Sequence, residues 1–208
     1  MRLLDLFCGA GGAAMGYHRA GFEVTGVDNK PQPNYPFEFV LGDALEYVTE
    51  HGAEFDVIHA SPPCQAYSEM QKIHNNISEH PQLIEPIRES LIKSGKIYII
   101  ENVKNAPLIN PIILCGTYFG LNIARHRLFE SNFDLFTLWP VCNHQGLYSK
   151  WRWEDKTKPE NWRGEREKLS EAMGIDWFMT RPEVREAIPP AYTEFIGKRI
   201  MEVDSESR

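Results

Sequence analysis

The thiol of Cys64 has the position in this chain that is most typical of a nucleophile. It ends the segment Ser61-Pro62-Pro63-Cys64, which follows an apolar run and so belongs to a loop after an expected strand. Loops on a rigid scaffold often carry reactive groups, whereas most free cysteines are small buried hydrophobic residues. Cys64 alone fits either interpretation, so the prediction depends on the residues that accompany it.

A carboxyl group and two arginines could assist such a thiol. Glu101 closes the apolar run at residues 97–100, where burial would raise the pKa of its carboxyl group. A raised pKa is what a proton donor at neutral pH requires. Arg125 and Arg127 could pair with this carboxylate in a structural role or could hold a substrate, and the two roles are compatible.

A glycine-rich turn and two acids indicate a cofactor. The turn Phe7-Cys8-Gly9-Ala10-Gly11-Gly12 lies between an expected strand and helix, and its glycines would let a nucleotide-like ligand approach the backbone. Asp28 ends the next strand, where a carboxylate can accept hydrogen bonds from a ribose. Asp43 could cap a helix or accept a hydrogen bond from an adenine amino group. A tight structural turn and two surface acids are the alternatives.

The segments that carry these groups alternate between expected strands and helices. We expect strands near residues 3–7, 22–27, 37–41, 55–60, 96–100, 112–114 and 127–129, and helices ending near 20, beginning near 43, and near 81–93, 166–173 and 190–203. Apolar strands separated by helices predict an α/β, Rossmann-like, mostly parallel sheet with helices on both faces. Ligands bind at the carboxyl ends of such strands, where the groups above fall.

Bulk properties narrow the class of protein. A chain of 208 residues with 42% hydrophobic and 25% charged residues predicts one folded domain with a small irregular appendage at residues 139–165. No apolar stretch reaches the roughly 20 residues of a membrane span, so we expect a cytoplasmic protein. The four cysteines form no Cys-x-x-Cys pair, and neither a metal site nor a disulfide framework is expected. Residues 150–168 mix basic, acidic and tryptophan side chains, which fits either a nucleic-acid contact or a solvated segment.

Taken together, seven motifs resemble the cytosine-5 DNA methyltransferases, in that family's order and over nearly the whole chain. The motifs are Asp5 to Gly12, Gly42-Asp43, Pro62-Pro63-Cys64-Gln65, Glu101-Asn102-Val103, Leu114-Cys115-Gly116 with Phe119-Gly120-Leu121, Arg125 to Phe129, and Ala187 to Tyr192. Ile123 and Glu186 stand where the family usually has glutamine and asparagine. The resemblance implies the class I fold of methyltransferases that depend on S-adenosylmethionine.

The resemblance also implies a cofactor and a reaction. S-adenosylmethionine would contact Asp5, Phe7, Cys8, Gly9, Gly11, Gly12, Asp28, Asn29, Asp43, Ala44, Pro62 and Ile188. Cys64 would add to carbon 6 of a cytosine flipped out of DNA, while Glu101 supplies a proton to the ring and carbon 5 takes the methyl group. Arg125 and Arg127 would hold the base carbonyl and a phosphate, and Asn102 would brace the loop of Cys64.

The region available for reading DNA is short. We expect a catalytic and cofactor-binding core at residues 1–132, a reduced target-recognition insert at 133–168, and a segment at 169–208 that completes the core. A compact enzyme of this kind is similar to orphan methyltransferases of phages and prophages, working in a bacterial or phage-infected cell. The same chemistry on RNA or a free cytosine nucleotide, or a non-catalytic nucleic-acid-binding relative, are the alternatives. The sequence predicts no oligomeric state.

Overall fold

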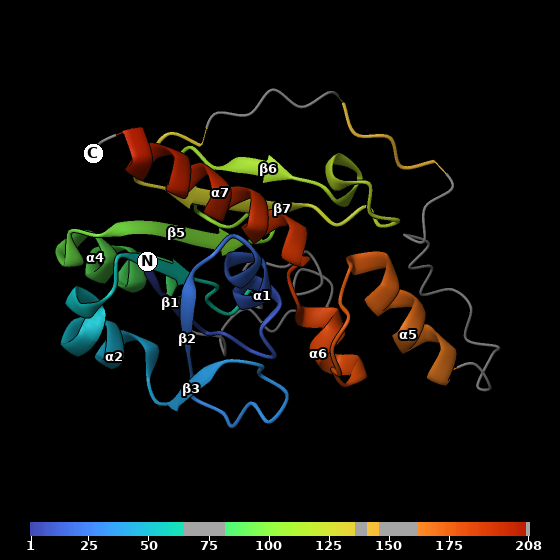
Figure 1. The fold of residues 1–208 in the computed structure, drawn as a ribbon, viewed down its shortest axis with the longest axis horizontal. Coiled ribbons are helices and arrows are strands. Elements are labelled where there is room, and N and C mark those ends of the chain that lie inside the picture. Colours follow the sequence, from blue (N-terminus) through green and yellow to red (C-terminus); the bar gives the residue numbers. More distant parts are fainter. Residues whose placement is uncertain (65–81, 136–140, 146–161, 207–208) are drawn as a thin grey trace.

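A seven-stranded sheet organises the protein (Figure 1). The structure is a computed structural model that describes residues 1–64, 82–135, 141–145 and 162–206. The strand order is β3-β2-β1-β4-β5-β7-β6. The strands are β1 (Arg2–Leu6), β2 (Glu23–Asp28), β3 (Glu38–Leu41), β4 (Val57–Ala60), β5 (Ile97–Asn102), β6 (Ile112–Leu114) and β7 (Arg127–Ser131).

The pairing of these strands fits the class I methyltransferase fold. Strands β1 to β5 are parallel to one another, whereas β7 runs antiparallel to both β5 and β6. The expected α/β, mostly parallel sheet is therefore confirmed. The antiparallel edge was not part of the prediction, because a short apolar run carries no information about strand direction.

Helices cover the sheet in the described part of the chain. They are α1 (Gly12–Arg19), α2 (Ala44–His51), α4 (Ile84–Ser94), α5 (Trp162–Met173), α6 (Arg181–Glu186) and α7 (Pro190–Glu206), with the 3-10 turns η1 (Gly52–Glu54) and η3 (Gly116–Phe119). None of the described helices has the length and apolar character that crossing a bilayer requires. Helix α6 was not predicted, and the loop expected at residues 65–80 lies outside the described residues.

The strands bury side chains on both faces. Successive residues of a strand point to opposite faces of the sheet, and Leu3 and Leu4 of β1 accordingly belong to different hydrophobic clusters. The cluster of Leu3 includes residues of α1 and α7, and the cluster of Leu4 includes residues of α2 and α4. In Figure 1, α5 and α6 lie together beside the sheet rather than on either of these two layers. The carboxyl ends of the central strands are thus held between two packed layers.

A buried ion pair fixes α4 to the antiparallel edge. The Arg88 guanidinium donates two hydrogen bonds to the Glu130 carboxylate of β7, from Nε at 2.7 Å and from Nη2 at 2.8 Å. The side chains are only 5% and 2% exposed. Arg88 also donates to the carbonyl of Pro107, and Glu130 accepts from the backbone N–H of Ile109. One bidentate pair therefore joins a helix, a strand and a connecting loop.

Glu130→Ala is expected to lower the free energy of unfolding by about 3 kcal/mol, because it removes the buried partner of Arg88 and leaves only the exposed carboxylate of Glu85 paired with the guanidinium. Urea unfolding followed by circular dichroism measures this loss. Glu89→Ala is the matched control, since the Glu89 carboxylate lies 3.9 Å from Lys93 on the exposed face of the same helix and should contribute about 1 kcal/mol or less. Equal losses in the two variants would contradict a stabilising role for the buried pair.

Candidate active site

A cavity of about 410 Å³ lies at the carboxyl ends of β1, β2, β4 and β5. Most of the predicted site residues line it. They are Asp5, Phe7, Cys8, Gly9, Gly12, Asp28, Asn29, Asp43, Ala44, Pro62, Cys64, Glu101, Arg127 and Ile188. Gly11, Asn102 and Arg125 do not line this cavity. Residues from both halves of the chain therefore meet in one space large enough for a small ligand.

The glycine turn leaves the backbone open toward the cavity. The backbone N–H of Cys8 donates to the carbonyl of Val27, which ties the turn to β2. Gly9 and Gly11 have φ angles of +49° and +87°, in the left-handed region that favours glycine. A Cβ atom on Gly9 would meet no atom within 4 Å, whereas one on Gly11 would lie 2.8 Å from Pro36. Gly9 therefore leaves room for a ligand, and Gly11 supports the turn from behind.

Gly12 joins the turn to the C-terminal part of the chain. A Cβ atom at this position would lie 2.5 Å from the carbonyl oxygen of Ile188. Only glycine allows so close an approach of the two backbones. The contact brings Ile188, which lies just before α7, to the wall of the cavity.

The carboxylates of two acids at the rim of the cavity accept hydrogen bonds from backbone N–H groups. Asp28 accepts hydrogen bonds from the N–H groups of Gly9 at 3.1 Å and Lys30 at 3.0 Å. Asp43 caps α2, as predicted, and accepts from the N–H groups of Leu45 and Glu46. Both bonds to Asp43 end on Oδ1. The two side chains are thus held in fixed orientations at the cavity.

Asp5 is buried without a hydrogen-bond partner. Its side chain is fully inaccessible, and among the described residues neither carboxylate oxygen has a partner. Burial raises the pKa of this carboxyl group well above its usual value, and the charge of Asp28 raises it further. A buried acceptor without a donor is costly. A cationic or hydrogen-bond-donating ligand in the cavity would relieve that cost.

Cys64 and Glu101 line the same cavity together with Arg127. Burial raises the pKa of the Cys64 thiol, while the positive charge of Arg127 acts to lower it. Glu101 is 6% exposed, and burial raises the pKa of its carboxyl group although Arg127, Arg125 and Ser61 oppose the shift. Arg127 Nε lies 2.9 Å from Glu101 Oε1 in an ion pair that lacks hydrogen-bond alignment. The site thus combines a thiol, a carboxyl group with a raised pKa, and a cation.

Asn102 and Arg125 lie behind the cavity wall. Asn102 Nδ2 donates to the carbonyl of Pro62 at 2.9 Å, which connects β5 to the loop that carries Cys64. Arg125 Nη2 donates to the carbonyl of Arg185 at 2.7 Å, and burial lowers the pKa of Arg125 to about 9. Tyr192 donates a hydrogen bond to the Arg125 carbonyl. Arg125 therefore links the start of β7 to α6 and α7.

Two groups of residues at the site were not predicted from the sequence. A buried chain of hydrogen bonds runs from the Tyr17 hydroxyl to His59 Nδ1 at 3.0 Å, from His59 Nε2 to Ser61 Oγ at 2.8 Å, and on to Glu101. Burial lowers the pKa of His59 to about 3, so its ring is neutral at neutral pH. Ser61 follows β4 directly, and that position was the signal that could have identified it.

The second missed group comes from α6 and the residues that follow it. Glu183 and Arg185 line the cavity, next to Glu186 and Ala187, which the last motif of the sequence had marked. Glu183 also accepts two hydrogen bonds from Asn34 Nδ2, at 3.1 and 2.9 Å. No local pattern in the sequence identifies Glu183 and Arg185, because their position depends on how the C-terminal segment packs.

Comparisons with known proteins identify relatives of this chain. Residues 1–108 match the family model described as C-5 cytosine-specific DNA methylase. The Type II methyltransferase M.FnuDI of Fusobacterium nucleatum is 32% identical over 112 residues, which cover 50% of this chain and 33% of the relative. M.XorII of Xanthomonas oryzae pv. oryzae is 28% identical over 165 residues, which cover 67% of this chain and 35% of the relative. The chain thus spans about a third of the length of these curated relatives.

A solved structure shares the fold over almost the full length. The S. pombe Dnmt2 methyltransferase superposes with a TM-score of 0.60 at 12% identity, covering 97% of this chain and 98% of that chain. At this identity the likeness concerns the fold alone. It agrees with the strand order and pairing described above.

Proposed function

Because the chain belongs to the family of C-5 cytosine-specific DNA methylases, we propose that it transfers a methyl group from S-adenosylmethionine to carbon 5 of cytosine in DNA. One observation carries the proposal. Cys64, Glu101 and Arg127 line the same cavity as the acids and the glycine turn. A nucleophile and a proton donor beside a cofactor pocket are what this reaction needs.

The residues of the cavity fit S-adenosylmethionine. The cofactor carries a positive sulfonium and an ammonium group, and the buried oxygens of Asp5 have no partner among the described residues. In this proposal Asp28 accepts from the ribose, Asp43 accepts from the adenine amino group, and the Phe7 ring lies against the adenine. Gly9, Asn29, Ala44, Pro62 and Ile188, with Cys8 and Gly12, complete the wall. When bound, the cofactor supplies an electrophilic methyl group.

Asp5→Asn is expected to weaken S-adenosylmethionine binding at least about 10-fold, because a charged hydrogen-bond acceptor is lost. The same change should stabilise the free protein. When the pKa of a carboxyl group is raised in the folded state, the free energy of unfolding of the protein falls as the pH rises above the unfolded pKa of that group. Asparagine does not titrate, so the variant avoids this loss. We expect the melting temperature to rise by about 2 °C or more at neutral pH and the gain to vanish below about pH 4.

Calorimetric titration and thermal melts measure these two effects of Asp5→Asn. Asp176→Asn is the control, since Asp176 lies on the exposed surface in an ion pair with Arg19 and should change neither quantity. A variant that is less stable at neutral pH and binds the cofactor normally would contradict the assignment of Asp5.

The proposed reaction uses Cys64 to activate an otherwise unreactive carbon. The Cys64 thiolate forms a bond to carbon 6 of the flipped cytosine while Glu101 gives a proton to ring nitrogen N3. Electron density then moves to carbon 5, which takes the methyl group from the sulfonium. N3 then returns its proton to the Glu101 carboxylate, and loss of the carbon 5 proton to a base with release of the Cys64 thiolate restores the aromatic ring. Both catalytic groups are regenerated at the end of the cycle.

Arg127 and Asn102 position these groups in the proposal. Arg127 holds the Glu101 carboxyl group through the ion pair and favours the thiolate of Cys64. Asn102 braces the Cys64 loop through the Pro62 carbonyl. Arg125 would position Arg127 from behind, with the base carbonyl or a phosphate as its further partner. Residues 133–168 are proposed to contact DNA as a short recognition insert, most of which lies outside the described residues.

Methyl transfer from labelled S-adenosylmethionine to duplex DNA, transfer RNA and dCMP tests the proposal. We expect label on duplex DNA, with bisulfite sequencing of a plasmid from expressing cells locating it at cytosines. Label on transfer RNA or dCMP alone would overturn DNA as the substrate. Cofactor binding without transfer to any of the three would favour a non-catalytic relative.

A further inference from the structure

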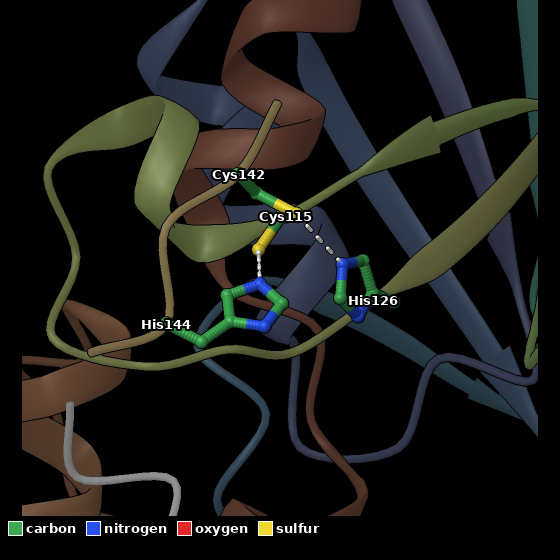
Figure 2. Close-up of side chains that lie close together, drawn as sticks. All are labelled: Cys115, His126, Cys142 and His144. Carbon is green, nitrogen blue, oxygen red and sulfur yellow. Dashed lines mark hydrogen bonds between the residues drawn. The ribbon is translucent and has the colours of Figure 1, made fainter. Parts of the chain in front are cut away.

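Two cysteines and two histidines meet at the antiparallel edge of the sheet, outside the cavity described above. Cys115, His126, Cys142 and His144 each direct one possible ligand atom to a common point (Figure 2), and these atoms all lie within 4.8 Å of one another. We propose that these four side chains bind one structural Zn²⁺ ion. The proposal does not depend on the proposed reaction.

Strand register explains how the first two ligands come together. In the antiparallel pair of β6 and β7, Leu114 lies opposite Arg127. The next residues outward, Cys115 and His126, therefore occupy the following opposed positions, where Cβ atoms are about 4.5–5.5 Å apart. The pairing places a thiol and an imidazole side by side at the end of the hairpin.

The other two ligands come from one short segment that returns to this edge. Cys142 and His144 are separated by a single residue, and Figure 2 shows both side chains directed toward Cys115 and His126. The Cys115 Sγ to His144 Nε2 distance is 3.4 Å, and the Cys142 Sγ to His126 Nε2 distance is also 3.4 Å. Tetrahedral zinc with its usual bond lengths places sulfur and nitrogen ligands about 3.5 Å apart.

The donor set favours zinc over other ions. Two thiolates and two imidazoles in a tetrahedral arrangement are typical of zinc, and four protein ligands leave no open position for catalysis. Thr117 donates a hydrogen bond to Cys115 Sγ at 3.3 Å, as the outer partners of metal-bound thiolates do. Cys115 is buried and Cys142 is partly buried, so the site is shielded without being closed to an entering ion.

Zinc at this point would tie two parts of the chain together. Residues 115 and 126 flank the connection between β6 and β7, whereas residues 142 and 144 belong to the range proposed as the recognition insert. A metal that joins them would close a long loop and stabilise the folded state. His126 lies between Arg125 and Arg127, so the same ion would also fix the start of β7 that carries the arginines.

Metal content of the full chain tests the proposal directly. Protein produced with zinc and dialysed without chelator should hold one equivalent by elemental analysis, and Co²⁺ replacing zinc should show the visible bands of a tetrahedral site and a thiolate charge-transfer band. His144→Ala and Cys142→Ser should each weaken zinc binding by more than about 100-fold, and Thr117→Val by about 10-fold. Cys64→Ser is the matched control and should keep the full equivalent.

Thermal melts with and without chelator accompany these measurements. Chelation should lower the melting temperature of the wild type and of Cys64→Ser, and should leave that of His144→Ala unchanged. His144 is exposed, so its replacement should not prevent folding. Wild-type protein without zinc, cobalt spectra that are unchanged in Cys142→Ser, or a Cys115–Cys142 disulfide in place of the metal would each overturn the proposal. Metal content is measured independently of methyl transfer, so neither result decides the other.

Discussion

Cys64→Ser is expected to reduce methyl transfer to cytosine by at least about 10³-fold, because a serine hydroxyl at neutral pH is a far weaker nucleophile than a thiol. Carbon 5 of cytosine becomes nucleophilic only after a group adds to carbon 6. The cofactor pocket should be unaffected, so S-adenosylmethionine binding should stay within about twofold of wild type. Transfer of labelled methyl groups and calorimetric titration measure the two quantities separately.

Covalent trapping gives a second measure of the same change. An oligonucleotide with 5-fluorocytosine cannot lose a proton from carbon 5, so the wild type should remain attached to it through Cys64 in denaturing gels, and Cys64→Ser should not. Because burial raises the thiol pKa, alkylation of free Cys64 should quicken as the pH rises through neutrality. Full turnover by the serine variant would overturn the assignment of the nucleophile.

Glu101→Gln is expected to lower kcat/KM by about 10²–10⁴-fold, the usual contribution of a positioned proton donor. Glutamine preserves the shape of the side chain and can bond to the cytosine ring, but it cannot give a proton to N3. It also leaves Arg127 without its counter-charge in the ion pair at 2.9 Å. Cofactor binding serves as the control and should change little, as should overall folding.

The pH profile distinguishes a lost proton donor from a structural defect in Glu101→Gln. The proposed active form has a thiolate at Cys64 and a protonated Glu101, and the pKa values of both groups are raised. Between the two pKa values the thiolate increases as the protonated carboxyl decreases, so kcat/KM of the wild type should be nearly flat. In Glu101→Gln only the thiolate titrates, and activity should rise with pH. If kcat/KM of Glu101→Gln were lower than that of the wild type by the same factor at every pH, Glu101 would have a structural role instead.

Several parts of the fold could be predicted from short stretches of sequence. The apolar runs located each strand to within a few residues, and the cap by Asp43 and the end of β2 at Asp28 followed from residue type alone. Such features depend on periodicity and capping, which act between neighbours in the chain. Parallel strands end at the same edge of a sheet, so residues after different strands could be expected to share a cavity.

Other parts depended on contacts between distant segments. Glu183 and Arg185 reach the cavity because the C-terminal segment packs against Gly12, and no local pattern marks them. Placing Cys115 beside His126 required the register of β6 and β7, and the spacing of the cysteines had predicted no metal site. The bond from Arg125 to the Arg185 carbonyl likewise joins residues far apart in the chain.

The sequence by itself therefore determined which groups could do chemistry and which strand ends carry them, because strand formation and chain order are local properties. The tertiary structure decided which of those groups face the cavity and which lie behind it, and which histidines meet which cysteines. The physical reason is that side-chain neighbours across a sheet or between packed segments depend on strand direction, register and close backbone contact. These are fixed only when the whole core is assembled.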